Sequence, residues 1–542
     1  MKIRNLTSLV LSSLFLLLFI PVFYSVLFIG SEMDYNPEHK ITTLWGNMPL
    51  FLLGILGLLI FILLYALLDR IPLNKYTAAG TVLFSFLTCV IFYAVKAESS
   101  KSIAFYGGWD CGMVANSARW LAQGQDIGYD DYYYIYSNNV PITWFLYILY
   151  RFSDSLPDYA YNPEFIWIQF QCILFALAVF LGAMAVFLIT RKIASALLCL
   201  LASLLVLGLC PWQIIPYTDA STIAMPVLTI FLYALFRNSA GKSRYAVWFL
   251  MVFAGALGGI LKATCYIALI AALLMDVLWL MSGRQKLKKL GIRLFLLACA
   301  FAAVLWCRSN MYKTVNYTPD YDLQMTWTNY FYNGLNQSTT GACSGDGLSI
   351  VRSYAGYPRR FRQSVELHYA KERILEMGIG GLLDFWLRKQ VMNFNDGTFG
   401  WFQEGFFHAW DYEKLTDSPF LKPLRDFYWK EGAAYAKFTT WSQGLWIFIL
   451  TGILFQGLLL IPSVLRQKNN TAARCIDTMT ILTFLGIFLF VMLFEGRARY
   501  LLNYLPVFIT IAILGYGRAA QAILPRIKTD RLPLCGQLHA AH

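Results

Sequence analysis

Long apolar runs are the feature of this sequence that most limits how the chain can fold. The stretches 50–68 and 445–461 contain no charged residue, and each is about as long as a helix needs to cross a bilayer, roughly 20 residues. A core helix of a soluble protein rarely continues this far without a charge. Charged residues make up only 14% of the chain, against about 25% in soluble domains. The sequence therefore predicts an all-α polytopic membrane protein.

We expect a bundle of about 12 transmembrane helices with two large extracytoplasmic loops. The first apolar run follows Lys2 and Arg4. It is long for the apolar segment of a signal peptide and lacks a clear cleavage site, so we interpret it as a membrane helix. The predicted helices span about 8–30, 48–68, 78–96, 163–190, 194–212, 221–237, 245–261, 264–282, 289–307, 441–464, 475–494 and 501–518.

Basic residues occur in every second link between these apolar runs. This alternation is typical of cytoplasmic loops, so we predict a multi-pass protein of the cytoplasmic membrane with both termini cytoplasmic. The net charge of +13 follows from the same bias and gives no reason to expect a nucleic-acid partner. The basic links include Arg70 with Lys75, Arg191 with Lys192, Arg237 with Arg244, Arg284 with Arg293, Arg466 with Arg474, and Arg518 with Arg526.

The same alternation places two long segments, 97–162 and 309–440, outside the membrane. Both have mixed charge and many aromatic residues, so both are predicted to fold. Helical spacing occurs at 114–121, and 140–152 resembles a helix lying in the membrane interface. We divide the chain into an N-terminal transmembrane hairpin (1–77), a membrane core with the first outer loop (78–308), a large outer loop (309–440), C-terminal transmembrane helices (441–519) and a cytoplasmic tail (520–542).

The eleven cysteines show neither a zinc nor a c-type haem spacing. Most lie inside apolar runs, where cysteine is a small core residue. Only Cys111 and Cys343 fall in the large polar loops, and the sequence leaves open whether they pair. We assign no metal ligands.

Two outer aspartates are candidate catalytic residues. Asp110 follows Trp109 and opens a helical stretch on the first outer loop, among aromatic side chains that can stack on a sugar. Asp219 follows Tyr217 on a very short outer link. Each acid has a simpler alternative role as a helix cap.

Three cations lie on the side of the membrane that is otherwise poor in positive charge. They are Lys262, between two apolar runs, and Arg497 and Arg499, just before the last helix. A snorkelling lysine and an ion pair with Glu495 are the simpler explanations. The unusual location favours an anionic ligand, because arginine binds phosphate through paired donors.

A further group of candidates lies late in the second outer loop and beside the arginines. Asn395, Asp396 and Gly397 form a turn signal, and the flanking aromatics suit either a carbohydrate or the interface. From this group we select Asp396, Trp401, Glu404 and Tyr500, with Trp109 and Tyr217, as candidate sugar- or acceptor-binding residues.

Taken in order, these features resemble the bacterial GT-C membrane glycosyltransferases, the group that includes protein O-mannosyltransferase-like (family 39-like) enzymes. The likeness covers about 97–510. It rests on the outer-loop Asp110 before a helix that ends in Leu-Ala-x-Gly, on Tyr-Thr-Asp at 217–219, and on Leu-Lys-Ala-Thr at 261–264, which resembles a Lys-Pro-Thr segment of Gram-positive members. Asn-Asp-Gly-Thr-Phe at 395–399 and Glu-x-Arg-x-Arg-Tyr-Leu at 495–501 complete the set.

The resemblance implies transfer of a hexose or pentose from a polyprenyl-phosphate donor to a cell-envelope glycan, lipid or protein outside the membrane. Asp110 would be the general base, and Lys262, Arg497 and Arg499 would bind the donor phosphate. The chain departs from the family pattern at Ala263, where proline is expected, and in an extra N-terminal helix pair. Asp110 has no adjacent acid, which leaves open whether Asp219 shares its role and whether a divalent cation, Mg or Mn, takes part.

Two other classes of protein would share the outer cations. A transporter or flippase of a lipid-linked glycan predicts more polar residues deep in the membrane and gives no reason for an outer loop of about 130 residues. An envelope glycan polymerase or ligase differs only in its donor, and the sequence does not separate it from the first hypothesis.

Overall fold

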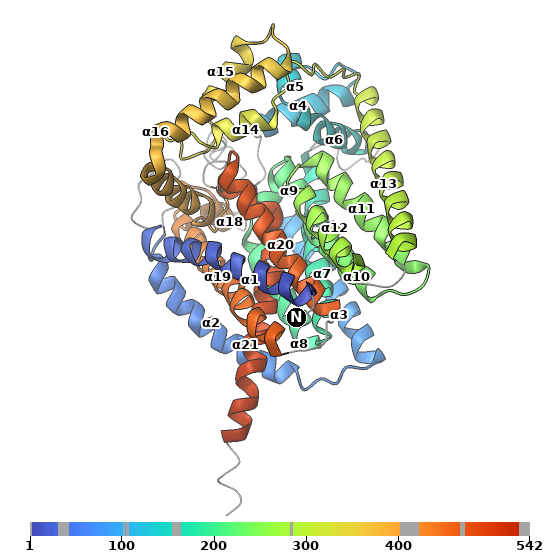
Figure 1. The fold of residues 1–542 in the computed structure, drawn as a ribbon, viewed down its shortest axis with the longest axis vertical. Coiled ribbons are helices and arrows are strands. Elements are labelled where there is room, and N and C mark those ends of the chain that lie inside the picture. The colour runs from blue at the N-terminus through green and yellow to red at the C-terminus, as the bar shows by residue number, and fades with distance from the viewer. Residues whose placement is uncertain are drawn as a thin grey trace, which may run out of the picture.

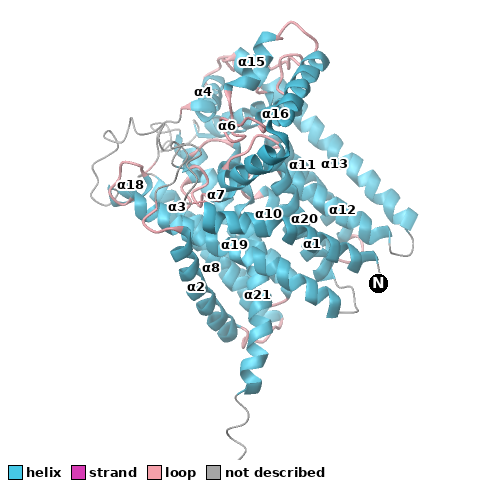
Figure 2. Ribbon diagram, turned by 60° about the vertical axis from the view of Figure 1, so that its left-hand side comes forward, coloured by secondary structure: helices cyan, strands magenta, loops and turns pink. Residues whose placement is uncertain are grey.

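The computed structural model describes residues 3–30, 43–100, 103, 108–153, 164–281, 286–401, 422–466 and 472–530. All regular structure within these residues is helical (Figure 1, Figure 2). Ten helices are long and apolar enough to cross a membrane, and two shorter apolar helices, Ile193–Leu209 and Cys265–Leu280, accompany them. The predicted fold class, an all-α polytopic membrane protein, is confirmed.

Each of the predicted membrane segments corresponds to a helix. The bounds are α1 (Ile3–Tyr24), α2 (Asn47–Leu68), α3 (Lys75–Ser100), α7 (Glu164–Thr190), α8 (Ile193–Leu209), α10 (Met225–Asn238), α11 (Ser243–Leu261), α12 (Cys265–Met281), α13 (Lys286–Thr314), α19 (Tyr435–Arg466), α20 (Ala472–Leu493) and α21 (Leu505–Asp530). Most of α7 is buried inside the protein, whereas only 17% of the apolar part of α2, α3 and α13 is buried, as expected of helices that face lipid.

The remaining helices are shorter or lie outside the apolar runs. They are η1 (Ser25–Ile29), α4 (Trp109–Ala122), α5 (Asp130–Ile135), η3 (Ser137–Asn139), α6 (Val140–Ser153), η5 (Trp212–Ile214), α9 (Thr218–Ser221), α14 (Trp327–Asn333), α15 (Gly345–Ser353), α16 (Arg359–Phe394), α18 (Lys422–Tyr428) and η7 (Ala498–Tyr504). Helices α4, α5, α6, α14, α15 and α16 gather at one end of the bundle, which we call the loop face, while α21 projects from the opposite end (Figure 1).

Several helix ends differ from the predicted ones. Helix α13 extends from Lys286 to Thr314, α19 begins at Tyr435, and α21 continues to Asp530, which makes the first part of the predicted tail helical. Hydropathy detects only the apolar part of a helix, and hydrogen bonding carries the helix on through polar residues. The stretch 140–152 is a helix as predicted, but many of its side chains, including Ile142 and Leu146, are buried in the core.

Cys111 and Cys343 do not pair. No disulfide bond joins these two residues, and the Cys111 thiol donates a hydrogen bond to the carbonyl oxygen of Gly108 at 3.1 Å. Cys111 is buried while Cys343 is exposed.

Helices α19 and α21 approach closely at two glycines. A Cβ atom added to Gly452 of α19 would lie 2.7 Å from the Cβ atom of Ala512 in α21, and one added to Gly515 would contact the backbone of Gly452. Small residues that allow such contact are the usual means by which membrane helices pack, because lipid provides no hydrophobic driving force between them.

We therefore predict that Gly515→Val destabilises the protein by about 1–3 kcal/mol, the usual cost of overpacking. Thermal unfolding in detergent would show this as a lower midpoint. Gly80→Val is the matched control, because a Cβ atom on Gly80 meets nothing within 4 Å. Equal midpoints for the two variants would contradict the proposed packing role of Gly515.

Candidate functional site

Asp110 lies in the first turn of α4, at the loop face. The cap position of α4 is Gly108, which is extended (φ −79°, ψ −159°), and no side chain caps this end. Instead, the Tyr217 hydroxyl donates to Asp110 Oδ2 at 3.2 Å, and the same hydroxyl lies 3.3 Å from Asn139 Oδ1. Asp110 is half-buried. The carboxylate therefore faces a polar group from another part of the chain and does not act as a simple helix cap.

Tyr217 remains a hydrogen-bond donor in this arrangement. Burial and the charge of Asp110 both raise the pKa of the Tyr217 hydroxyl well above its usual range, and Arg499 partly offsets them. Burial, with a contribution from the Asp110 charge, likewise raises the pKa of Tyr132, whose hydroxyl accepts from Asn139 Nδ2 at 2.5 Å. Asp110 is therefore surrounded by neutral tyrosines that stay protonated at neutral pH.

Asp219 is fully buried in α9 and lies between two cations. Lys262 Nζ donates to Asp219 Oδ1 at 2.6 Å, and Arg499 Nε lies 3.7 Å from Asp219 Oδ2. The cap residue of α9 is Tyr217, and no side chain caps this helix either. We call these three residues the ion triad. Its members come from α9, the α11–α12 link and η7, so the triad joins three parts of the bundle.

The position of Lys262 is set by contacts at the break between α11 and α12. Lys262 leaves the helix with extended backbone (φ −149°, ψ 117°). Two residues on, the Thr264 hydroxyl accepts from Asn503 Nδ2 at 3.0 Å, and the Thr264 carbonyl accepts from the Tyr504 hydroxyl at 2.7 Å. Because Asn503 and Tyr504 belong to the same η7 segment as Arg499, these bonds fix the lysine relative to the arginine.

Aromatic rings surround the two cations. The guanidinium carbon of Arg499 lies 4.5 Å from the ring centre of Trp109 and 5.6 Å from that of Tyr217. Lys262 Nζ lies 5.3 Å from the ring of Tyr500. The Trp109 and Tyr217 rings are themselves edge to face, 5.0 Å apart. Cations are attracted to such ring faces, so Trp109, Tyr217 and Tyr500 all belong to the same site as the ion triad.

Glu495 connects this site to the second long segment. Its carboxylate accepts from the Tyr500 hydroxyl at 2.5 Å and from Asn333 Nδ2 at 3.2 Å. The half-buried Arg497 follows two residues later in extended conformation (φ −163°, ψ 168°), so it lies beside Glu495 and Arg499 along the chain.

A buried lysine of α16, Lys389, also links the second long segment to the residues just before the arginines. Lys389 Nζ donates to the carbonyl oxygens of Gly334 at 2.5 Å and of Phe494 at 2.8 Å. Burial lowers the pKa of the Lys389 amine from 10.5 to about 7, although the charge of Glu495 opposes the shift. The large second segment is therefore attached at Phe494, shortly before Arg497 and Arg499 in the chain.

The turn at 395–401 lies behind the site. Asp396 accepts hydrogen bonds from Thr398 N at 2.7 Å, Thr398 Oγ1 at 2.6 Å and Gly400 N at 2.7 Å, and burial raises the pKa of its carboxyl group. A Cβ atom added to Gly400, where φ is +77°, would lie 3.7 Å from Arg499 Cβ. Asp396 therefore holds a turn that supports the backbone of Arg499.

Trp401 is also a buried part of this support. Its indole N–H donates to the carbonyl oxygen of Tyr428 at 2.7 Å, and its ring lies 6.0 Å from that of Trp212. Sugar or acceptor binding by Asp396 and Trp401 stays a prediction. Glu404 lies outside the described residues.

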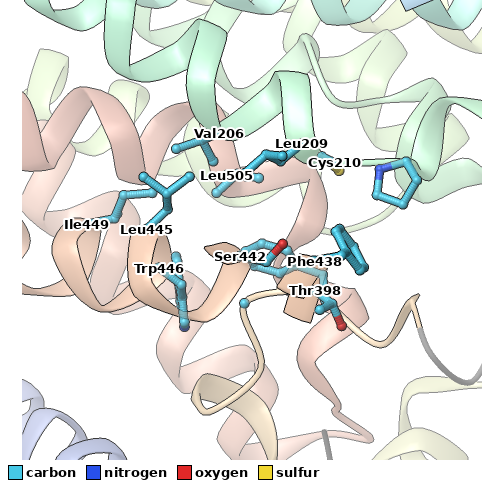
Figure 3. Close-up of a pocket in the computed structure, with 13 residues that line it drawn as sticks. Val206, Leu209, Cys210, Thr398, Phe438, Ser442, Leu445, Trp446, Ile449 and Leu505 are labelled. Atoms are coloured by element: carbon cyan, nitrogen blue, oxygen red, sulfur yellow. The ribbon is translucent and has the colours of Figure 1, made fainter. Parts of the chain in front are cut away.

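An apolar groove leads from this turn into the bundle, between α8, α19 and α21. Its upper part is narrow and is lined by Leu209, Thr398, Phe438 and Trp446 among others (Figure 3). A second part shares the lining residues Val206, Leu445 and Ile449 and extends to Tyr516. One end of the groove therefore lies at the turn that supports Arg499, and the other lies deep in the apolar helices.

Three residues that complete the site were not selected from the sequence: Tyr132, Asn139 and Asn333. Asn139 contacts Tyr217 and Asn333 contacts Glu495, and in both pairs the partners lie far apart along the chain. Asn503 had a usable signal, because a polar residue at the start of an apolar membrane segment is uncommon and often functional. Among the described residues, no group of three or more His, Cys, Asp or Glu side chains could hold a metal ion, so we derive no metal-dependent step.

Comparison with known proteins gives one match. A family model described as conserved hypothetical integral membrane protein matches residues 3–520. No curated protein and no solved structure matches the chain.

The lowered pKa of Lys389 predicts a pH-dependent stability. Above about pH 7 the folded protein buries a neutral amine, while the unfolded chain keeps its proton up to about pH 10.5. The unfolded state then binds more protons, so the contribution of Lys389 to stability rises with pH through this window. Relative to Lys389→Met, the wild type should gain about 2–3 kcal/mol between pH 6 and pH 9.

Thermal unfolding in detergent at several pH values would measure this difference. Lys371→Met, an exposed lysine of the same helix, should keep the pH profile of the wild type. Parallel profiles for the wild type and Lys389→Met would mean that Lys389 does not titrate in this range.

Proposed function

This chain belongs to that family of conserved integral membrane proteins, and we propose that it is a membrane glycosyltransferase. It would transfer a sugar from a polyprenyl-phosphate donor to a glycan, lipid or protein of the cell envelope. In this proposal the loop face is extracytoplasmic, in agreement with the positions of the basic links. The observation that carries the proposal is that a half-buried carboxylate and a cationic cluster, far apart in sequence, meet at one aromatic-lined site.

Asp110 is the proposed general base. It is half-buried, so an acceptor hydroxyl can reach it. The Tyr217 hydroxyl, 3.2 Å away, would orient the carboxylate by donating to its Oδ2 atom. Asp110 would take the proton as the acceptor oxygen attacks the anomeric carbon.

Lys262 and Arg499, with Arg497, are the proposed donor-phosphate ligands. As the bond between the anomeric carbon and the phosphate oxygen breaks, its electron pair stays with the polyprenyl phosphate. The cations stabilise that developing charge. A single displacement of this kind would invert the anomeric centre.

Asp219 then has a positioning role rather than a share in the proton transfer. It is fully buried, with Lys262 at 2.6 Å and Arg499 at 3.7 Å, so its charge holds both cations at the site before the donor arrives. A buried carboxylate bound in this way is poorly placed to accept a proton from an incoming hydroxyl. Trp109, Tyr217 and Tyr500 would provide ring faces for the sugar.

The apolar groove suits the lipid part of the donor. Its upper end lies at the turn that packs against Arg499, and its walls are mostly aliphatic and aromatic side chains of α8, α19 and α21. A polyprenyl chain in this groove would place its phosphate near the cations while the prenyl units stay within the apolar helices. Ligand sites between bundle helices commonly have this form.

The first prediction from this proposal concerns Asp110. Purified protein should consume a polyprenyl-phosphate sugar in the presence of a suitable acceptor, and Asp110→Asn should lower kcat about 10²–10⁴-fold, the usual contribution of a general base. Asp126→Asn, an exposed acid of the same loop, should be as active as the wild type. A panel of donor sugars and acceptors, followed by release of polyprenyl phosphate, measures both.

An Asp110→Asn variant with wild-type turnover would show that the base assignment is wrong. If the wild type consumed no lipid-linked sugar but moved it between leaflets of a vesicle, the transporter alternative would replace the enzyme.

The second prediction concerns the groove. Ala202 lines its deeper part, so Ala202→Trp should fill the space and raise KM at least tenfold for a donor with a long polyprenyl chain. The same variant should use a short-chain donor as well as the wild type does. Leu201→Trp is the control, because Leu201 is exposed on the outside of α8. Equal KM values for long donors in both variants would place the lipid elsewhere.

A further inference from the structure

A second charged cluster lies at the end of the bundle opposite the loop face. Helices α10, α11, α12 and α13 each contribute one residue to it: Arg237, Arg244, Asp276 and Arg293. These helices lie side by side in Figure 1, and consecutive ones pack against each other. We call these four residues the arginine cluster. It takes no part in the site at the loop face.

The three guanidinium groups are close to one another. Their central carbons lie 5.8, 4.6 and 5.3 Å from the ring centre of Phe236 for Arg237, Arg244 and Arg293 respectively. Like charges at this separation repel strongly when they are shielded from water. Attraction to the ring face offsets part of that repulsion, but a ring carries no net charge.

One carboxylate pairs with two of the three arginines. Asp276 Oδ2 accepts from Arg293 Nη1 at 2.6 Å and from the Trp248 indole N–H at 3.1 Å. Asp276 Oδ1 lies 3.8 Å from Arg237 Nη1, too far for a hydrogen bond. Neither the α10–α11 link (239–242) nor the α12–α13 link (282–285) contains an Asp or Glu. The cluster therefore carries an excess of two positive charges.

Several hydrogen-bond donors of the cluster have no acceptor within the described part of the chain. The Arg237 side chain is only 3% exposed, yet among the described residues its Nε and Nη1 atoms have no hydrogen-bond partner, and neither does Nε of Arg244 or of Arg293. Buried charged donors without acceptors are unfavourable. A dianionic or monoanionic phosphate would supply acceptor oxygens and charge together, in the geometry that guanidinium groups prefer.

The neighbouring side chains indicate where such a phosphate comes from. Val277 follows Asp276 on α12, and Leu294 and Phe295 follow Arg293 on α13, and all three are exposed apolar residues. The arginine cluster thus lies next to a surface that faces acyl chains, close to the helix ends where lipid headgroups lie. Basic pockets between membrane helices bind anionic headgroups in this way.

We propose that the arginine cluster, with guanidinium groups from α10, α11 and α13 around Phe236 and a single carboxylate, binds the phosphate headgroup of an anionic membrane lipid. A bound headgroup would hold helices α10–α13 together at the end of the bundle opposite the loop face. The proposal does not depend on the glycosyltransferase function.

The test is a lipid titration of the purified full-length protein in detergent, with the thermal midpoint as the measurement. Dioctanoyl phosphatidylglycerol should raise the midpoint saturably, whereas dioctanoyl phosphatidylcholine and inorganic phosphate at the same concentrations should not. Arg244→Gln, at the half-buried edge of the cluster, should weaken the apparent Kd for phosphatidylglycerol at least tenfold. Arg466→Gln, an exposed arginine at the end of α19, removes the same charge and should bind as the wild type does.

A second variant distinguishes a loss of lipid binding from a loss of folding. Asp276→Asn keeps an acceptor for Trp248 but raises the excess positive charge, so phosphatidylglycerol should raise its midpoint by more than it raises that of the wild type. Equal shifts with phosphatidylcholine, or unchanged binding by Arg244→Gln, would overturn the proposal. An equal shift with inorganic phosphate would identify a soluble ligand instead of a lipid.

Discussion

The contact of Asp219 with Lys262 and Arg499 is the interaction on which the arrangement of the loop face depends. A fully buried carboxylate at 2.6 Å from an ammonium group is stable only while its cations stay in place, because a buried charge without a partner is costly. The three residues come from α9, the α11–α12 break and η7. The two contacts of the Asp219 carboxylate therefore align three separate segments of the bundle and set where Arg499 meets Trp109.

The two large segments are attached to this alignment from opposite sides. The first reaches it through Trp109, whose ring lies against Arg499, and through the Tyr217–Asp110 hydrogen bond. The second reaches it through Lys389 and Asn333, which bind the residues just before the arginines. The turn held by Asp396 supports Arg499 from behind. In the proposed function, a site at which two loops meet fixed cations would admit an acceptor and a donor from different directions.

The balance between acidic and basic side chains differs between the two ends of the bundle. At the loop face, Asp110, Asp219 and Glu495 lie near Lys262, Arg497 and Arg499, so cations and acids balance in number. At the opposite end three arginines share Asp276, and two positive charges are left over. Under the two proposals, the balanced site would hold its cations in place and exchange a ligand, whereas the unbalanced cluster would keep an anion bound. Both follow from the same requirement, that a buried charge needs a partner.

By itself the sequence determined the fold class and the membrane segments, and it placed Lys262, Arg497 and Arg499 at the helix ends opposite the basic links, because hydropathy and charge bias are local properties of the chain. It also selected Asp110 and Asp219 for their positions beside aromatic residues on predicted outer links, and Lys262 and Arg499 because they depart from the charge bias. Only the tertiary structure decided that Asp219 pairs with Lys262, that Asp396 holds a turn, and that Cys111 and Cys343 stay apart. In the sequence, Arg237, Arg244 and Arg293 are ordinary residues of basic links. Only the packing of the helices shows that they lie near one aspartate, Asp276. Partners in space come from different helices, and the order of residues along one chain does not contain the distances between them.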